Sequence, residues 1–331
     1  MKILHIGKPG NIERFTKEGS LLRTQRIVDM VRDLPVEEYL KQASDADAII
    51  VDAITPIPAE LIDAMPHLKI IHSEGVAFNA IDLEAATKRN IPVCNCAGMN
   101  AVAVAEQAVL LMCGMLRDIV GGDRAVRDGR QIEKKEAYMA AGNLMELSDL
   151  SIGLVGYGAI AKETARLLRA YGVQTIYYYK RTRLTAEEEE KEGVVYRDLP
   201  ALLAESDLVS LHLPVNEETM HIADDDFFGQ MKQGSYLVNT ARGELVDDAA
   251  LIRALQSGQL AMAGLDTLDD EPVAKDHPLL TAPQEVTDRI LFSPHIGGIT
   301  ASSFRRGYTI ITKNIERIAH GETPASIVNR S

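Results

Sequence analysis

The sequence predicts an α/β protein made of two doubly wound domains, and three observations support this fold class. Short apolar segments alternate with helical patterns, as in parallel sheets that are covered by helices. A second series of this kind begins at Ser151. A last helix, expected at 300–320, carries an apolar stripe that must cover another surface. The stripe consists of Phe304, Tyr308, Ile311, Ile315 and Ile318.

The tail helix decides how the chain is divided. We place its apolar stripe on the first domain, so that this substrate domain is built from residues 1–100 and 300–331. The second domain, at 101–299, is then inserted between these two parts. Thr300 is suited to cap the helix and Gly321 to end it. A cleft between two such domains is a common place for a small-molecule site.

Each domain contains several candidate strands. In the first domain they lie at 2–7, 46–52, 68–73 and 91–96. In the second domain six segments are expected to form a doubly wound sheet, at 152–158, 175–180, 208–214, 235–240, 260–266 and 290–295. A nearly uncharged helix at 100–117 must be buried. The polar residues 121–149 are expected to form an irregular arm.

Composition excludes several classes of partner. The net charge of −13 argues against nucleic acid and against anionic membrane surfaces. The longest apolar run, at 101–116, contains Glu106 and Gln107 and is shorter than the roughly 20 residues that span a bilayer. Cys94 and Cys96 lack the second ligand pair of a zinc site. We expect no metal, reduced cysteines and a cytoplasmic protein.

A glycine-rich turn opens the second domain. Residues 153–182 read as a strand, the pattern Gly-x-Gly-x-x-Ala, a helix and a second strand. Gly156 allows a tight turn, Gly158 lets the backbone approach a pyrophosphate, and Ala161 allows close packing of helix and strand. This context favours a dinucleotide site over a plain strand–turn–helix.

The end of the second strand indicates which dinucleotide binds. NAD sites usually place an acid there for the ribose hydroxyls, but the position is Tyr179, followed by Lys180, Arg181 and Thr182. Cations and a hydroxyl suit the 2′-phosphate of NADP. We therefore expect NADPH to be preferred, with NAD possible. The alternative is that these cations only complement the solvated acidic helix that follows Thr185, which Glu188 completes as a capping box.

Four chemically complementary residues follow later strands. Arg242, Asp266, Glu271 and His295 stand near carboxyl ends of strands, where open α/β sheets bind ligands. Arginine holds a carboxylate by two hydrogen bonds. Histidine is a general acid or base near neutral pH, and a neighbouring carboxylate fixes its tautomer. Each residue alone also has a structural explanation, such as a surface ion pair for Arg242 or a turn at Glu271.

Five segments together resemble one family. "VGYGAIA", "HLP", "VNTARGELVD", "AGLDTLDDEP" and "SPHIGG" resemble, in order and spacing, the D-isomer-specific 2-hydroxyacid dehydrogenases. The resemblance implies a split substrate domain, an inserted Rossmann domain, and a homodimer whose arm is 121–149. It implies an NAD(P)-dependent enzyme that reduces a small 2-oxo acid, of glyoxylate or hydroxypyruvate type, to a D-2-hydroxy acid.

The resemblance also implies a role for each site residue. Arg242 would bind the substrate carboxylate, and His295 would protonate the carbonyl oxygen, with its pKa raised by Glu271. Backbone amides of Gly75, Val76 and Ala77 would hold the carboxylate, although the family usually has Gly at Ala77 and Asp at Asn79. The cofactor would contact residues of the matching segments, namely Gly156, Gly158, Ala159, Ile160, Tyr179, Lys180, Arg181, Thr182, His212, Pro214, Thr240, Ala241, Asp266, His295, Gly297 and Gly298.

Two alternatives stay open. Phosphoglycerate dehydrogenases of the family carry arginines in the loop after the second strand, where this chain has Asp52, Ala53 and Ile54. Phosphoglycerate would therefore need another cation in the site, such as Lys8 or Arg14. The second alternative is a non-catalytic regulatory protein that senses dinucleotides with the same fold, since fold alone does not fix function.

Overall fold

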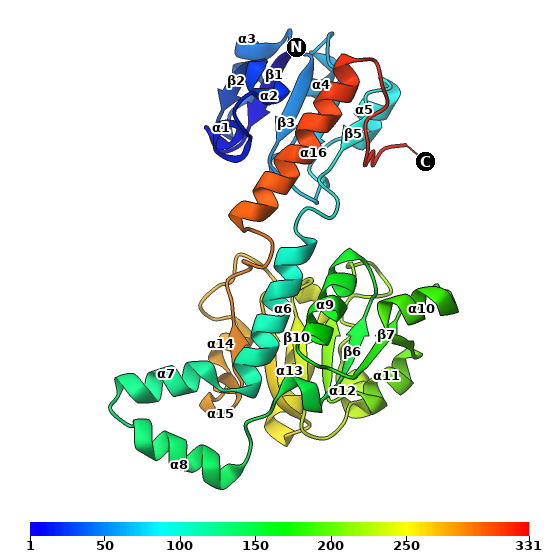
Figure 1. The fold of residues 1–331 in the computed structure, drawn as a ribbon. Helices are drawn as coiled ribbons and strands as arrows, with labels where there is room; N and C mark the ends of the chain where they lie inside the picture. Colours follow the sequence, from blue (N-terminus) through cyan, green and yellow to red (C-terminus); the bar gives the residue numbers. More distant parts are fainter. Residues whose placement is uncertain (331) are drawn as a thin grey trace. The chain divides into compact units, whose positions relative to one another are not determined.

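The computed structural model describes residues 1–330 and divides into two compact units. The first unit contains Met1–Asn100 and the residues from Ile299 on, and the second unit contains Ala101–Gly298 (Figure 1). The second unit is thus inserted into the first. Both are built around a parallel sheet, which confirms the predicted fold class.

The first unit contains a five-stranded parallel sheet in the order β2-β1-β3-β4-β5. Its strands are β1 (Lys2–Ile6), β2 (Arg26–Met30), β3 (Ala48–Val51), β4 (Ile70–Ser73) and β5 (Val93–Cys94). Its short helices are α1 (Asn11–Phe15), α2 (Leu21–Thr24), α3 (Val36–Ala43), α4 (Ala59–Asp63) and α5 (Leu83–Lys88). The sequence prediction missed β2, because this edge strand is only half-buried and carries Arg26 and Asp29.

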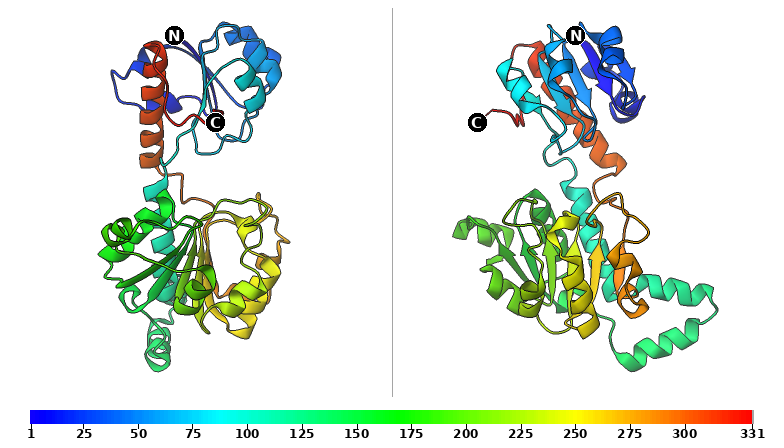
Figure 2. Two further views of the ribbon diagram at one scale, coloured as in Figure 1. Left: turned by 90° about the vertical axis from the view of Figure 1, so that its right-hand side faces the viewer. Right: turned by 180° about the vertical axis from the view of Figure 1, so that it is seen from behind.

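Helix α16 (Ala301–Ala319) completes the first unit, as predicted. The Thr300 hydroxyl accepts a hydrogen bond from Ser303 N–H, and Gly321 follows with a φ of 74°. Tyr308, Ile311 and Ile315 are buried in one cluster with residues of β1, β3 and β4. The helix therefore covers one face of this sheet (Figure 2).

The second unit contains a seven-stranded parallel sheet in the order β12-β11-β10-β9-β6-β7-β8. Its strands are β6 (Ser151–Val155), β7 (Thr175–Tyr179), β8 (Val195–Tyr196), β9 (Leu208–Leu211), β10 (Ser235–Asn239), β11 (Leu260–Leu265) and β12 (Ile290–Phe292). The prediction missed β8, which is only two residues long. The helices that follow the strands are α9 (Ala159–Ala170), α10 (Ala186–Glu192), α11 (Leu199–Glu205), α12 (Asp225–Gln230), α13 (Asp248–Ser257), α14 (Pro278–Thr281) and α15 (Gln284–Thr287).

Alternating side chains along each strand enter different apolar clusters, which is why the sheets are doubly wound. Leu154 lies in one cluster of the second unit, and the next residue, Val155, lies in another. In the first unit Ile3 and Leu4 are divided in the same way. Each sheet therefore has helices and a core on both faces.

Helix α6 (Ala101–Leu116) begins the second unit. Most of its side chains are buried, as predicted, but Leu110 is 62% exposed. Gly264 of β11 allows the helix to approach the sheet, since a Cβ there would lie 3.1 Å from Leu111 Cβ. No helix among the described residues is long and apolar enough to cross a membrane.

The expectation of an irregular arm at 121–149 is wrong. The segment contains most of α7 (Ile119–Arg127) and all of α8 (Gln131–Ala141), which extend away from the sheet of their own unit (Figures 1 and 2). Gly121, Gly122 and Gly129 resemble loop signals in the sequence. The helices form because Asp118 accepts from Gly121 N–H and from the Tyr138 hydroxyl, at 3.1 and 2.6 Å.

Candidate active site

The glycine turn after β6 is shaped for a ligand. Gly156 has a φ of 92°, and a Cβ there would lie 2.5 Å from the His212 carbonyl oxygen, so only glycine fits. Gly158 precedes α9 and has open space where a Cβ would point. Ala161 is fully buried against the sheet. The free N–H groups of the first turn of α9, including those of Ala159 and Ile160, make this a suitable place for a pyrophosphate.

The cations after β7 do not all have the same partner. Arg183 makes two hydrogen bonds to Glu189 of the acidic helix, at 2.7 and 2.9 Å. Arg181 instead lies 3.2 Å from Glu218, and both of these side chains are highly exposed. Lys180 has no ion-pair partner among the described residues. The acidic helix therefore holds Arg183 in an ion pair, whereas it makes no ion pair with Lys180 or Arg181 among the described residues.

Further predicted cofactor contacts lie at the ends of β9 and β10. Burial of the His212 ring lowers its pKa to about 4, so the ring is neutral at physiological pH. Pro214 follows it in the loop after β9 and is exposed. The Thr240 hydroxyl is buried without a hydrogen-bond partner among the described residues. An orphaned hydroxyl beside the strand ends, together with the open space at Gly158, fits a bound dinucleotide.

The loop that carries Arg242 is held rigidly by its neighbours. The Asn239 carboxamide donates to the Arg242 carbonyl oxygen at 2.7 Å and accepts from Ala241 N–H at 3.0 Å. A Cβ at Gly243 would collide with the Leu268 backbone at 1.8 Å, so glycine is required for this close approach. The guanidinium itself is exposed, and within residues 1–330 its hydrogen bond is to the Ala241 carbonyl oxygen. It is therefore available to a ligand.

His295 and Glu271 meet although they lie on different loops. His295 Nδ1 is 2.6 Å from Glu271 Oε2, while Glu271 Oε1 accepts from Leu268 N–H at 3.1 Å. The His295 backbone has a left-handed φ of 52°, which is sparsely populated by residues other than glycine and is common at functional sites. Its N–H donates to the Asp266 carbonyl oxygen at 2.8 Å. Because Leu268 also touches Gly243, these loops connect the histidine with the Arg242 loop.

Asp266 is buried and organises the segment that follows β12. Its carboxylate accepts from the Ser293 hydroxyl and from the N–H groups of Ile296 and Gly297, at 2.5, 3.0 and 2.8 Å. Gln107 of α6 in turn donates to the Ser293 hydroxyl at 2.9 Å. A Cβ at Gly297 would lie 2.9 Å from the carboxylate, which explains why glycine stands there, with Gly298 beside it. The sequence reasoning did not anticipate Ser293 and Gln107.

The loop Gly75–Ala77 belongs to the first unit and follows β4. Its carbonyl groups are occupied: Gly75 accepts from Cys96 N–H, Val76 from the Asn95 carboxamide, and Ala77 from the Ser73 hydroxyl. The N–H groups of Val76 and Ala77 have no acceptor among the described residues. Ala77 does not adopt a left-handed φ, so alanine in place of the family's glycine causes no backbone strain.

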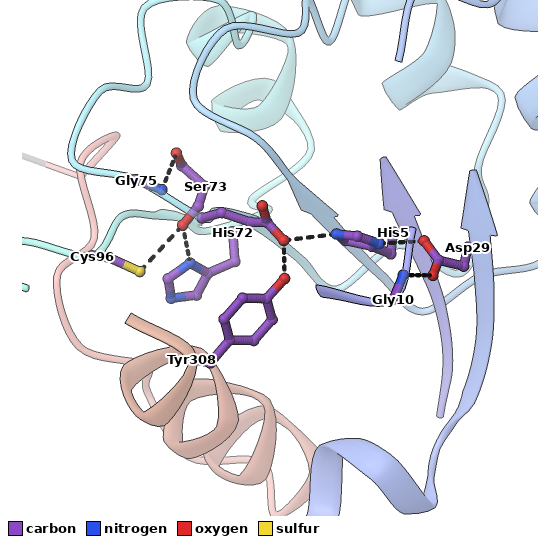
Figure 3. A network of polar contacts seen from close by, with 9 residues as sticks. His5, Gly10, Asp29, His72, Ser73, Gly75, Cys96 and Tyr308 are labelled. Atoms are coloured by element: carbon purple, nitrogen blue, oxygen red, sulfur yellow. Dashed lines mark hydrogen bonds and ion pairs between the residues drawn. The ribbon is translucent and has the colours of Figure 1, made fainter. Parts of the chain in front are cut away.

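A buried charged network, which we call the His5 network, holds the residue that precedes this loop (Figure 3). His5 of β1 is completely buried, with Nδ1 at 2.5 Å from Asp29 and Nε2 at 2.7 Å from Glu74. Tyr308 of α16 also donates to Glu74, which directly precedes Gly75. Sequence reasoning missed this network. Its only signal was a histidine within an otherwise apolar strand.

The electrostatics of the network favour an imidazolium. Burial alone would lower the pKa of His5, but hydrogen bonds and charge from Glu74 and Asp29 outweigh burial and raise it above the ordinary value. Both ring nitrogens face carboxylates, so the cation can donate on both sides. His72, two residues before Glu74, is different: burial lowers its pKa to about 4, and its Nε2 faces the Asn314 carboxamide at 3.0 Å.

Comparisons with known proteins agree with the geometry. The model of the D-isomer specific 2-hydroxyacid dehydrogenase, NAD binding domain, matches residues 109–297. A glyoxylate reductase of Thermofilum pendens is 35% identical over 325 residues, which cover 96% of this chain and 94% of the relative. A D-3-phosphoglycerate dehydrogenase of Archaeoglobus fulgidus is 34% identical over 91% of this chain and 55% of the relative.

Solved structures show the same fold. The apo form of Rhodotorula graminis D-mandelate dehydrogenase aligns with a TM-score of 0.83 at 27% identity, over 99% of this chain and 97% of that one. Family match, full-length relatives and split-domain fold all point to the same conclusion. The chain belongs to the D-isomer specific 2-hydroxyacid dehydrogenase family, oxidoreductases that act on CH–OH donors with a nicotinamide dinucleotide.

Proposed function

We propose that this protein reduces a small 2-oxo acid of glyoxylate or hydroxypyruvate type to the D-2-hydroxy acid. The observation that carries the proposal is the 2.6 Å contact between His295 and Glu271, which are joined by their loops to the exposed Arg242. A proton donor, its orienting carboxylate and a carboxylate-binding arginine are the groups that this reduction requires. The relative named glyoxylate reductase supports the size of the substrate.

Each residue then has a defined task. Arg242 binds the substrate carboxylate and polarises the 2-oxo group, and the N–H groups of Val76 and Ala77 add hydrogen bonds to the carboxylate. The dinucleotide supplies the hydride when it is bound. His295 donates a proton from Nε2 to the carbonyl oxygen, while Glu271 keeps Nδ1 protonated and the ring oriented. Asp266 receives the nicotinamide carboxamide and holds the strand end that carries His295.

The dinucleotide is proposed to be NADPH in preference to NADH. Its pyrophosphate would lie over Gly156–Ile160, and its 2′-phosphate beside Lys180, Arg181 and Thr182. Further contacts would come from Tyr179, His212 and Pro214, and from Thr240, Ala241 and the glycines after His295. The support is that Lys180 and Arg181 make no ion pair with the acidic helix among the described residues, whereas Arg183 does.

We also propose a cytoplasmic homodimer joined through the arm 121–149. Arm helices α7 and α8 bury almost nothing within their own chain, where Ala125 is their only buried residue. Exposed apolar side chains gather on this region and on the adjoining α6. They are Leu110, Ile119, Val126, Ile132, Met139 and Leu144.

A panel of 2-oxo acids with both reduced cofactors tests the proposal. Glyoxylate and hydroxypyruvate should give the highest kcat/KM, and NADPH should exceed NADH. Phosphoglycerate dehydrogenation is the second candidate, because one relative carries that name. Preferred oxidation of 3-phosphoglycerate would select this second activity, and cofactor binding without turnover of any acid would contradict both.

A further inference from the structure

A hollow of about 340 Å³ lies in the first unit, apart from the loop Gly75–Ala77. It is bounded by the turn after β1, by α1, and by the start of α16. Its lining residues are Lys8, Asn11, Arg14, Phe15, Ile299, Ala301 and Phe304. All of them belong to the same compact unit, so the hollow is a feature of that unit alone.

The polar side of the hollow is built from donors. Lys8 and Arg14 have no ion-pair partner among the described residues, and no Asp or Glu lines the hollow. Asn11 is only 9% exposed, yet its carboxamide makes no hydrogen bond within the described chain. Two cations without an ion-pair partner thus flank a mostly buried amide that makes no hydrogen bond within the described chain. The arrangement suits an anionic group.

The other side of the hollow is apolar. The rings of Phe15 and Phe304 stack with centroids 4.9 Å apart, and Phe15 also lies 5.9 Å from the ring of Tyr308. Ile299 adds an aliphatic side chain that is 60% exposed. The complementary ligand is therefore a small organic anion with an apolar or planar part beside its charge.

The end of β1, which precedes the hollow's Lys8, lies close to Glu74, the residue before the proposed carboxylate loop. A Cβ at Gly7 would lie 3.6 Å from both Asp52 and Glu74, and Glu74 directly precedes Gly75. Lys8 follows Gly7, and Asp29 of the His5 network holds Gly10 N–H at 2.8 Å. The turn after β1, which carries Lys8, and the loop Gly75–Ala77 thus both follow the carboxyl ends of strands of the five-stranded sheet.

We propose that this hollow binds the carboxylate or phosphate at the far end of a 2-oxo acid substrate. The proposal rests on the proposed function, because it presumes that the 1-carboxylate occupies the loop Gly75–Ala77. The cations that the Asp52–Ile54 loop lacks are then supplied by Lys8 and Arg14. A free anion shares the same chemistry, so the experiment must separate the two sources.

Matched substrate pairs provide the first arm of the experiment. Two ratios of kcat/KM are measured, that of 2-oxoglutarate to 2-oxopentanoate and that of 3-phosphohydroxypyruvate to hydroxypyruvate. In the double variant Lys8→Met/Arg14→Gln each ratio should fall about tenfold, as the loss of charge-assisted hydrogen bonds predicts. The kcat/KM values of 2-oxopentanoate and hydroxypyruvate, which carry no charge at the far end, should be unaffected. Lys17→Met, an exposed lysine outside the hollow, is the control and should leave both ratios unchanged.

Inorganic phosphate provides the second arm and needs no turnover. If phosphate raises the Tm of the wild type but not that of Lys8→Met/Arg14→Gln, the hollow is an anion site. Loss of this shift with unchanged substrate ratios would identify a free anion as the ligand and refute the substrate assignment. Unchanged ratios together with equal phosphate shifts in both proteins would overturn the whole inference. Absence of turnover with every acid would refute the proposed function, while the phosphate arm still decides the anion site.

Discussion

At the residue scale, the imidazole of His295 is fixed on one side and free on the other. Glu271 holds Nδ1 at 2.6 Å, and Nε2 has no hydrogen-bond partner among the described residues. His295→Gln should lower kcat about 10²–10⁴-fold, the usual contribution of a general acid. The dissociation constant of NADPH should change little, as measured by equilibrium titration. His67→Gln, an exposed histidine of the first unit, is the control. Normal turnover in His295→Gln would remove this residue from the mechanism.

Arg242 tests whether geometry or charge binds the substrate. A lysine keeps the charge but cannot make two parallel hydrogen bonds to a carboxylate. Arg242→Lys should therefore raise KM and lower kcat together, each by about tenfold or more, since one charge-assisted hydrogen bond contributes about 1.5–3 kcal/mol. Steady-state kinetics with glyoxylate measure both effects. Near-normal kinetics would show that Arg242 stabilises its loop and does not bind the substrate.

The proposed role of the cations after β7 in the choice of cofactor can be tested by substitution. Lys180→Ser/Arg181→Ser should raise KM for NADPH about tenfold and leave KM for NADH nearly unchanged, because only NADPH carries the 2′-phosphate. Glu218→Gln should lower KM for NADPH. The substitution releases Arg181 from its ion pair at 3.2 Å and removes a negative charge that would repel the 2′-phosphate. Salt should weaken NADPH binding more than NADH binding, because these groups are exposed.

Arg183→Ser is the matched control for this experiment, because Glu189 already holds Arg183. We expect it to leave the ratio of the two KM values unchanged. A wild-type enzyme that prefers NADH would contradict the assignment of the 2′-phosphate site. An equal rise of KM for both cofactors in the double variant would contradict it as well.

At the element scale, the His5 network joins β1, β2, the end of β4 and α16. The raised pKa of His5 means that the folded state binds a proton more tightly than the unfolded state. This stabilisation is fully present below the unfolded pKa, about 6.5, and is lost as the pH rises through the folded value. His5→Gln should therefore cost more stability at pH 6, about 3 kcal/mol for a broken buried pair, than at pH 9.

Chemical denaturation of wild type and variant at the two pH values measures this difference. His67→Gln is again the control, with no change expected at either pH. An equal loss of stability at pH 6 and pH 9 would mean that His5 contributes by packing and not by its charge. In that case Asp29, Glu74 and Tyr308 would have to be stabilised by other contacts.

The elements that could be predicted are those whose side chains repeat one pattern. The central strands β1, β3, β6 and β9 are mostly apolar and were recognised. Edge strands β2 and β8 were not, because a strand paired on one side needs little burial. The arm helices were missed because their glycines signal loops, whereas the stabilising contacts of Asp118 with Tyr138 and Lys134 span up to 20 residues.

The site was predictable to a similar extent. Glu271 and His295 each stand in a local motif, and the resemblance of these motifs to the family implied their pairing. The contacts of Gln107 with Ser293, and of His5 with Glu74, join residues 186 and 69 positions apart. No local pattern encodes such contacts, because each side chain is ordinary in its own segment and gains its role only in the folded unit.

At the scale of the whole molecule, the arm is the part whose stability the contacts within its own chain do not explain. Isolated short helices are marginal in water, and α7 and α8 have almost no core of their own. Between them lies a mostly apolar hollow of about 240 Å³, lined by residues that include Val126, Tyr138, Met139 and Leu144. A second copy of the chain is the partner that we expect to cover it.

The last prediction follows from this exposed arm. Val126 is 56% exposed and Met139 is 73% exposed. If they are buried between two copies, Val126→Asp/Met139→Asp places charges in an apolar interface and should convert the dimer into a monomer, since unpaired buried charges cost several kcal/mol. Sedimentation equilibrium measures the change.

The control variant is Val195→Asp, which adds a charge to the edge strand β8 and should remain dimeric. The Val195 side chain is 44% exposed. The Tm of the wild type should rise with protein concentration and that of the double variant should not, because association stabilises only the folded dimer. A wild type that sediments as a monomer, or a double variant that stays dimeric, would refute the role of the arm.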